Sequence, residues 1–224
     1  MNLLAIETST DRLSIAVSAA GRLHEATRTV GQRHAELALD AIDAVLAAAG
    51  IDRSDLDGVA FGAGPGSFTG LRIATGIAQG LALGLEIPVV GVSTLASLAE
   101  PSESPRVFAC LDARMGEVYC AAYERSPSGW RTVVEPGVFS PDAVPVPADT
   151  DWAGRGSGFA SHGERLAARL GRAIVSVEPD AFPTARAVLR LAEPRLAAGE
   201  GTDPMGALPT YIRDKVALKT SERR

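Results

Sequence analysis

Two short polar segments in the first half of the chain carry residue types that bind phosphate or metal. Glu7, Thr8 and Ser9 follow the first apolar run, and a glycine-rich loop spans residues 64–70. A carboxylate beside hydroxyl groups can hold a cation or a phosphate, and a glycine-rich loop before a helix can direct backbone N–H groups at an anion. The candidate nucleotide or phosphate loop therefore comprises Glu7, Thr8, Ser9, Gly64, Gly66, Ser67 and Thr69.

Each of these segments also has a purely structural interpretation. The loop lacks the Gly-Lys-Ser/Thr ending of a P-loop, so it also fits a tight strand-to-helix turn in which Ser67 or Thr69 caps the helix. Close packing of the loop on a partner protein is a further alternative. Glu7 and the hydroxyl residues after it could simply form a turn.

The sequence predicts no metal site and no catalytic residue. The three histidines, His24, His34 and His162, form no pair with a metal-binding spacing. There is no G-x-S-x-G motif for a nucleophilic serine. His34 is expected at the protein surface or at an interface rather than as a metal ligand.

The helix expected after the glycine-rich loop, residues 68–85, is apolar around nearly its whole circumference. Such a helix is buried on more than one side. Gly76, Gly80 and Gly84 are four residues apart and therefore share one face, where another helix could approach closely. The approaching helix could belong to the same chain, or to a partner that also contacts residues 34–49.

The first hundred residues predict three strands followed by alternating helices and strands. The strands are expected at residues 2–7, 13–17 and 23–29, then at 58–62 and 87–92; the helices are expected at 34–49, at 68–85 and after Ser93. This order is typical of an α/β protein of the actin-like ATPase class (ASKHA, RNase H-like). A doubly wound sheet would alternate strands and helices from the start.

The second half predicts a smaller α/β unit after a linker at residues 101–105. We expect strands at 107–111 and 118–123, loops and edge strands over 126–150, and helices at 161–170 and 184–198. Residues 154–158 are expected to form the turn before a helix, or a remnant of an adenosine-side loop.

A hairpin over residues 107–125 that turns near Met115 would place Cys110 opposite Cys120. We expect both thiols to be reduced in a cytosolic core, with pairing as the alternative. Asp112, Arg114 and Glu117 cluster at the same turn, where a solvated surface is the simplest interpretation.

Composition excludes several classes of function. The chain has 224 residues, 46% hydrophobic residues and a formal net charge of −5, which fits a globular protein and disfavours independent tight RNA binding. The longest apolar-rich stretch, residues 71–85, contains Arg72, Thr75 and Gln79, so a membrane span is not expected. The N-terminus has no signal-peptide pattern, and we expect a cytoplasmic protein.

Five segments in order resemble the signature blocks of the TsaB (YeaZ) family of tRNA threonylcarbamoyladenosine biosynthesis proteins. They cover residues 4–10, 64–73, 89–95, 112–119 and 209–213, and the block Gly-Pro-Gly-Ser-Phe-Thr-Gly-Leu-Arg-Ile at 64–73 is the most specific. Glu7 departs from the pattern, because many relatives carry aspartate there. The longer side chain puts any metal role of Glu7 in doubt.

The resemblance implies two actin-like domains, the second one reduced, with boundaries at residues 1–105 plus 200–224 and at 106–199. It implies a non-catalytic subunit of the machinery that adds threonylcarbamoyl to the adenosine next to the anticodon of tRNAs reading codons that start with adenine. The implied partners are a TsaD-like catalytic subunit and, through it, a TsaE-like ATPase; the chain alone is expected to form a homodimer and to meet tRNA only indirectly.

The resemblance also implies where a partner binds. The contact would involve the two helices of the first domain, through His34, Leu37, Ala41, Val45, Arg72, Ile73, Gly76, Ile77, Gly80 and Gly84. No cofactor is assigned to this chain itself, and binding of ATP or ADP at the interface of the complex is left open. The basic tail, with Arg213, Lys215, Lys219, Arg223 and Arg224, is expected to be solvated, with an approach to tRNA as the alternative.

Two functions of other classes remain as alternatives. A metal-dependent threonylcarbamoyltransferase or glycoprotein endopeptidase of the TsaD type would need two histidines one helical turn apart, but Thr94 and Leu98 stand at those positions. An actin-like small-molecule kinase would need phosphate-binding segments in both domains. The second half offers only residues 154–158 for that purpose.

Overall fold

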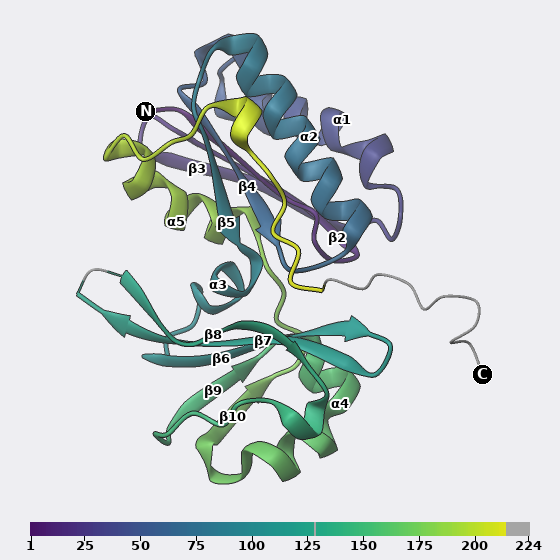
Figure 1. Cartoon of the computed structure of the whole chain (residues 1–224). Coiled ribbons are helices and arrows are strands. Elements are labelled where there is room, and N and C mark those ends of the chain that lie inside the picture. Colours follow the sequence, from purple (N-terminus) through teal and green to yellow (C-terminus); the bar gives the residue numbers. More distant parts are fainter. Residues whose placement is uncertain (128, 214–224) are drawn as a thin grey trace.

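The computed structural model describes residues 1–127 and 129–213, which form two five-stranded sheets stacked one above the other (Figure 1). The first sheet contains β1 (Leu3–Glu7), β2 (Arg12–Ala19), β3 (Arg22–Thr29), β4 (Gly58–Gly64) and β5 (Val89–Ser93), in the order β3-β2-β1-β4-β5. β1 pairs antiparallel with β2 and parallel with β4.

Helices cover both faces of the first sheet. Two of them, α1 (His34–Ala49) and α2 (Phe68–Leu85), pack on one face, and α5 (Ala185–Ala197) packs on the other. Gly50 ends α1 with a φ of 72°, which is a left-handed conformation that glycine adopts at little cost. The first sheet with these three helices is called the first subdomain below.

The second sheet repeats the strand order of the first. It contains β6 (Arg106–Arg114), β7 (Glu117–Ser126), β8 (Gly129–Phe139), β9 (Trp152–Arg155) and β10 (Ile174–Glu178), in the order β10-β9-β6-β7-β8. β6 pairs antiparallel with β7 and parallel with β9, as β1 does with β2 and β4. The helix α4 (Ser157–Leu170) packs on one face of this sheet, and sheet and helix together are called the second subdomain below.

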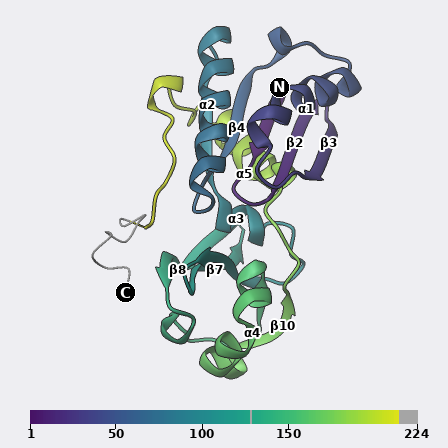
Figure 2. The ribbon, with the colours of Figure 1, turned by 90° about the vertical axis from the view of Figure 1, so that its right-hand side faces the viewer.

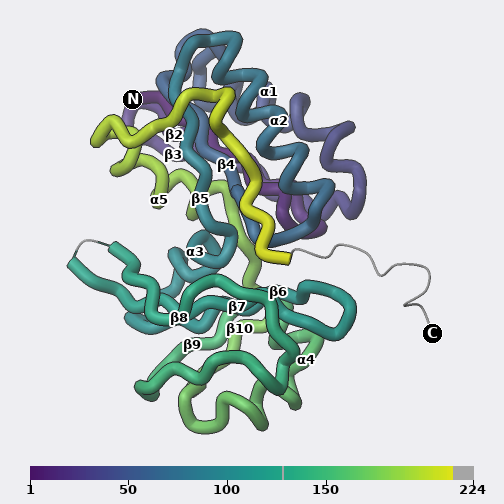
Figure 3. The backbone as a smooth tube through the Cα atoms, in the orientation of Figure 1, coloured from purple at the N-terminus to yellow at the C-terminus, as the bar shows by residue number. Residues whose placement is uncertain are grey.

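The short helix α3 (Thr94–Ala99) lies between the two sheets (Figure 2). Leu95 and Leu98 are fully buried, and they pack with Val107, Ala109 and Ala121 of the second sheet. Turns of 3-10 helix lie at Arg53–Asp55, Pro141–Ala143, Gly171–Ala173 and Pro204–Gly206. Figure 3 shows the C-terminal segment in yellow, running beside α2 from the top of the first subdomain towards the second.

The order of elements predicted for the first hundred residues and the actin-like fold class are confirmed. The bounds of the two long helices of the first subdomain also agree with the prediction. β10 was missed, although Val175 and Val177 alternate with Ser176 and Glu178; most of this short strand is exposed. α4 begins at Ser157 rather than at residue 161, directly after the turn at Gly156.

The predicted domain ranges stay a prediction. The packing of α5, however, differs from the domain to which those ranges assign this helix. Although α5 falls within 106–199, its apolar face, with Ala185, Val188 and Leu189, packs on β1, β4 and β5 of the first sheet. The apolar faces of α5 and of the first sheet are buried against each other. Local sequence patterns cannot specify on which sheet a helix packs. Residues 214–224 of the predicted first domain lie outside the described residues.

Candidate functional site

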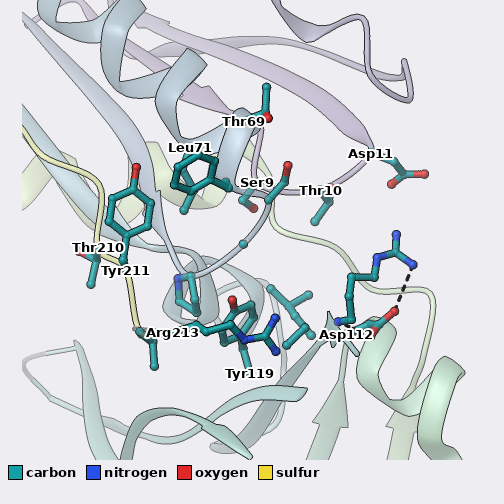
Figure 4. Close-up of a pocket in the computed structure, with 18 of the residues that line it drawn as sticks. Ser9, Thr10, Asp11, Thr69, Leu71, Asp112, Tyr119, Thr210, Tyr211 and Arg213 are labelled. Atoms are coloured by element: carbon teal, nitrogen blue, oxygen red, sulfur yellow. Dashed lines mark hydrogen bonds and ion pairs between the residues drawn. The ribbon is translucent and has the colours of Figure 1, made fainter. Parts of the chain in front are cut away.

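A cleft of about 710 Å³ opens between the two subdomains (Figure 4). Its upper wall comes from the turn after β1, from the glycine-rich loop and from the start of α2. Its lower wall comes from the turn between β6 and β7, and the C-terminal segment closes one side. The lining residues that project a polar side chain include Ser9, Thr10, Asp11, Ser67, Thr69, Asp112, Arg114, Tyr211 and Arg213.

Glu7 lies at the end of β1, next to this cleft, and is buried to 1% exposure. The backbone N–H of Ser9 donates a hydrogen bond of 2.6 Å to Oε1 of Glu7. Burial raises the pKa of the Glu7 carboxyl above its ordinary value of 4.5, although hydrogen bonds from Ser9 and Thr8 act in the opposite direction. The buried carboxyl is therefore easier to protonate than an exposed glutamate.

Replacement of Glu7 by glutamine is expected to stabilise the chain increasingly as pH rises. Because the folded-state pKa is raised, the stability that protonated Glu7 contributes is complete below the ordinary pKa of 4.5 and is lost as pH rises through the folded-state pKa. The difference in unfolding free energy between Glu7→Gln and wild type should therefore grow with pH, measured by urea denaturation from pH 4.5 to 8. A difference that stays constant with pH would mean that Glu7 is not destabilised by burial.

The glycines of the loop are used for close packing inside the chain. A Cβ on Gly70 would overlap the carbonyl oxygen of Thr8, and a Cβ on Gly66 would lie 2.6 Å from Cβ of Ser9. The hydroxyl of Thr8 also donates to the carbonyl oxygen of Gly70 at 2.8 Å. The turn after β1 and the glycine-rich loop thus form one compact unit, in which glycine is needed for contact between two backbones.

The loop also starts α2 as the capping interpretation predicted. The hydroxyl of Ser67 accepts a hydrogen bond of 3.3 Å from the N–H of Gly70, while the N–H of Ser67 donates to the carbonyl oxygen of Ser9 at 2.8 Å. Of the predicted phosphate-binding residues, Glu7, Thr8, Ser9 and Gly64 are buried, whereas Ser67 and Thr69 are exposed at the cleft. A phosphate in the cleft would therefore meet the N-terminus of α2 and these two hydroxyls.

The predicted contact surface on α2 is open in the single chain. Gly76, Gly80 and Gly84 are exposed, and a Cβ added to any of them would have no atom of the described chain within 4 Å. Leu83 on the same helix is 55% exposed, and Leu39 on α1 is 47% exposed. The close packing that this glycine face permits is therefore not used within the described part of the chain.

The remaining predicted contact residues divide into three groups: exposed, half-buried and buried. Arg72 is exposed, whereas Leu37, Ala41, Ile73 and Ile77 are half-buried at the edge of the first subdomain.

His34 and Val45 require a correction, because both are buried at 4% exposure and are not available to a partner in this structure. Nε2 of His34 lies 3.1 Å from the carbonyl oxygen of Arg12, and Val45 packs in the core.

The positions that would carry metal-binding histidines in a TsaD-type enzyme are enclosed. Thr94 and Leu98 lie on α3 between the subdomains, and both are fully buried. Within the described residues, no group of three or more His, Cys, Asp or Glu side chains could hold a metal ion. None of the described helices is both long and apolar enough for a membrane span.

The hairpin of β6 and β7 confirms the predicted register. Cys110 pairs with Cys120 across the two strands, and both thiols are free and buried. Burial raises the pKa of Cys120 to about 12, so its thiol is protonated near neutral pH. The turn residue Arg114 is exposed, as expected for a solvated turn.

Tertiary structure brings Asp112, Tyr211 and Arg213 to the cleft, a placement that sequence reasoning did not predict. Nε2 of His162 in α4 lies 3.7 Å from the carboxylate of Asp112, and the N–H of Asp112 donates a hydrogen bond of 3.1 Å to the hydroxyl of Ser157. Tyr211 and Arg213 reach the cleft from the far end of the described chain. The sequence singled out both residues through the last family-like block, and Arg213 also as part of the basic tail.

The matched family model identifies the class of protein. The model described as "TsaD: tRNA N6-adenosine threonylcarbamoyltransferase" matches residues 26–219. The chain is therefore a TsaD-related protein with two actin-like subdomains.

Relatives along the full chain are more specific. The tRNA threonylcarbamoyladenosine biosynthesis protein TsaB of Escherichia coli is 35% identical over 98% of this chain and 97% of its own length. The protein of the same description from Haemophilus influenzae is 33% identical over 98% and 96%. YeaZ from Pseudomonas aeruginosa superposes with a TM-score of 0.87 at 38% identity and covers 94% of this chain and 99% of that one. The chain belongs to the TsaB family of tRNA threonylcarbamoyladenosine biosynthesis proteins.

Proposed function

We propose that this chain is a non-catalytic accessory subunit of the complex that adds threonylcarbamoyl to the adenosine adjacent to the anticodon of tRNAs. It pairs with a TsaD-like catalytic subunit and, through that subunit, supports a TsaE-like ATPase. In the absence of the catalytic subunit it forms a homodimer. The chain acts in the cytoplasm and meets tRNA through the complex.

The open glycine face of α2 is the observation that carries this proposal. An exposed helix face without Cβ atoms allows the backbone of a second helix to approach closely, and exposed Leu39 and Leu83 supply apolar area beside it. The contact surface consists of Leu37, Leu39, Ala41, Arg72, Ile73, Gly76, Ile77, Gly80, Leu83 and Gly84. Enclosure of Thr94 and Leu98 supports the non-catalytic role, because neither position offers an imidazole or an open coordination site.

A nucleotide, if the complex holds one near this chain, would meet the cleft side of the loop. Ser67 and Thr69 at the start of α2 would contact its phosphate groups, because backbone N–H groups and the helix dipole both favour an anion there. Glu7 would act only on the position of this loop, because its carboxyl is buried behind Gly62 and the turn at Ser9.

The test is to mix this chain with the TsaD-like subunit from the same cell and to measure molar mass by size-exclusion chromatography with light scattering. We expect the chain alone to elute as a homodimer and the mixture to elute as a one-to-one heterodimer. A threonylcarbamoylation assay on tRNA should then require the TsaD-like subunit in every active mixture.

Two outcomes would contradict the proposal. If the chain and the TsaD-like subunit elute separately at concentrations well above those in the assay, the pairing is wrong. If the purified chain modifies tRNA without the TsaD-like subunit, the non-catalytic role is wrong, and a catalytic site would have to be sought around the cleft.

A further inference from the structure

The end of the described chain crosses from one subdomain to the other at the open side of the cleft. Residues 207–213 run along the first subdomain, and the last of them, Arg213, reaches the turn between β6 and β7. Figure 2 shows this segment on one side of the molecule and the chain from β10 to α5 on the other. Residues 207–213 are called the strap below.

The strap is firmly attached to the first subdomain. Gln79 of α2 donates to the carbonyl oxygen of Ala207 at 2.8 Å, and the N–H of Thr210 donates to the carbonyl oxygen of Ala63 at 2.6 Å. Nε of Arg72 donates to the hydroxyl of Tyr211 at 3.0 Å. These bonds are spread over much of the strap, so it moves with the first subdomain.

An aromatic contact reinforces this attachment at the mouth of the cleft. The ring of Tyr211 lies 5.4 Å from that of Phe68, centroid to centroid, and the guanidinium of Arg72 lies 3.9 Å from the centroid of the Phe68 ring. Phe68 and Arg72 both belong to α2, so the strap is joined to the same helix that presents the proposed contact surface.

The strap contacts the second subdomain through the side chain of Arg213. Nη2 of Arg213 lies 2.5 Å from Oε2 of Glu117, and Nη1 lies 3.8 Å from the sulfur of Met115. The guanidinium also faces the ring of Tyr119 at 5.8 Å. The Arg213 side chain is only 16% exposed, so the ion pair is partly shielded from water and is stronger than a fully solvated one.

The opposite side of the cleft has the features of a hinge. There α3 packs between the sheets, and Nε of Arg155 in β9 donates to the carbonyl oxygen of Leu98 at 3.1 Å. The chain passes between the subdomains on this side at residues 100–105 and 179–184. Subdomains joined in this way rotate about the linking segments unless another contact holds them.

We propose that the strap is an interdomain latch: the Arg213–Glu117 ion pair holds the second subdomain against the first and sets the width of the cleft. Release of this pair opens the cleft about α3. This inference does not depend on the proposed function, because the latch lies within one chain.

The test measures the distance between the subdomains directly. Spin labels on Asp40→Cys of α1 and Glu164→Cys of α4, both at exposed positions, report this distance by pulsed electron paramagnetic resonance. The native Cys110 and Cys120 are fully buried, which protects them from the label. Charge reversal by Arg213→Glu, and separately by Glu117→Arg, is expected to give a longer mean distance and a broader distribution than the parent pair of labels.

The double variant with both charges exchanged decides whether the ion pair itself is responsible. It is expected to restore the narrow parent distribution. Asp142→Arg is the matched control, because Asp142 pairs with Arg165 inside the second subdomain and its reversal should leave the distance unchanged. Unchanged distances in both single variants, or a double variant that stays open, would overturn the latch.

Discussion

The variant Gly70→Ala is expected to lose about 3 kcal/mol of folding stability, at the upper end of typical overpacking effects. The new Cβ would overlap the carbonyl oxygen of Thr8, and both groups in this contact belong to backbones that cannot change rotamer. The turn after β1 and the start of α2 must therefore separate, which also weakens the bond from the Thr8 hydroxyl to Gly70. For a chain of this size the melting temperature should fall by about 6–12 °C, measured by circular dichroism.

Gly163→Ala is the matched control for this experiment. Gly163 follows the kink at His162 in α4 and has open space around its Cβ position, so the same exchange meets no steric conflict. It should stabilise by about 0.4–1 kcal/mol, because alanine restricts the unfolded chain more than glycine does. If Gly70→Ala melts at the wild-type temperature, the loop is not held against Thr8 in solution. The loop would then be free to take the more open path that a phosphate-binding role allows.

The variant Gly80→Leu is expected to weaken self-association by about 1–3 kcal/mol, because a bulky side chain separates two closely packed helices. This change raises the dissociation constant of the homodimer about 5- to 150-fold, measured by sedimentation equilibrium. The fold of the single chain should be unaffected, since nothing lies within 4 Å of the Cβ position in the described structure. The same variant should weaken pairing with the TsaD-like subunit if both partners use α2.

Gly163→Leu makes the same exchange on a helix outside the proposed surface and should leave the dissociation constant unchanged. A Gly80→Leu chain that dimerises as tightly as wild type would show that α2 is not the contact. The proposed surface would then have to move to another exposed apolar part of the first subdomain.

Much of the fold could be read from short-range patterns. The spacing of apolar residues over 34–49 and 68–85 predicted both long helices, and Gly50 marked the end of the first one. The alternation around Ile15 predicted a strand that the structure confirms, and the hairpin at Met115 predicted the pairing of Cys110 with Cys120, which is also confirmed. These features succeed because a single helix or hairpin is governed by neighbours in sequence.

Individual site residues were harder to predict, because helical periodicity does not say which face of an amphipathic helix is covered. Val45 lies on the predicted contact helix but packs in the core, while Leu39 on the same helix is exposed. His34 was expected at the surface and instead contacts the carbonyl oxygen of Arg12 from inside the fold. Both differences depend on where α1 sits on the sheet, which is a tertiary property.

Residue types at fixed short spacings were enough to identify the family, the order of the elements in the first hundred residues, and the glycine face of α2. The openness of this face, the packing of α5 on the first sheet and the contact of Arg213 with Glu117 across the cleft became visible in the folded chain alone. The two residues of that ion pair are 96 positions apart in the sequence. Contacts over such separations arise only when the packed sheets bring distant segments together, and no local pattern encodes them.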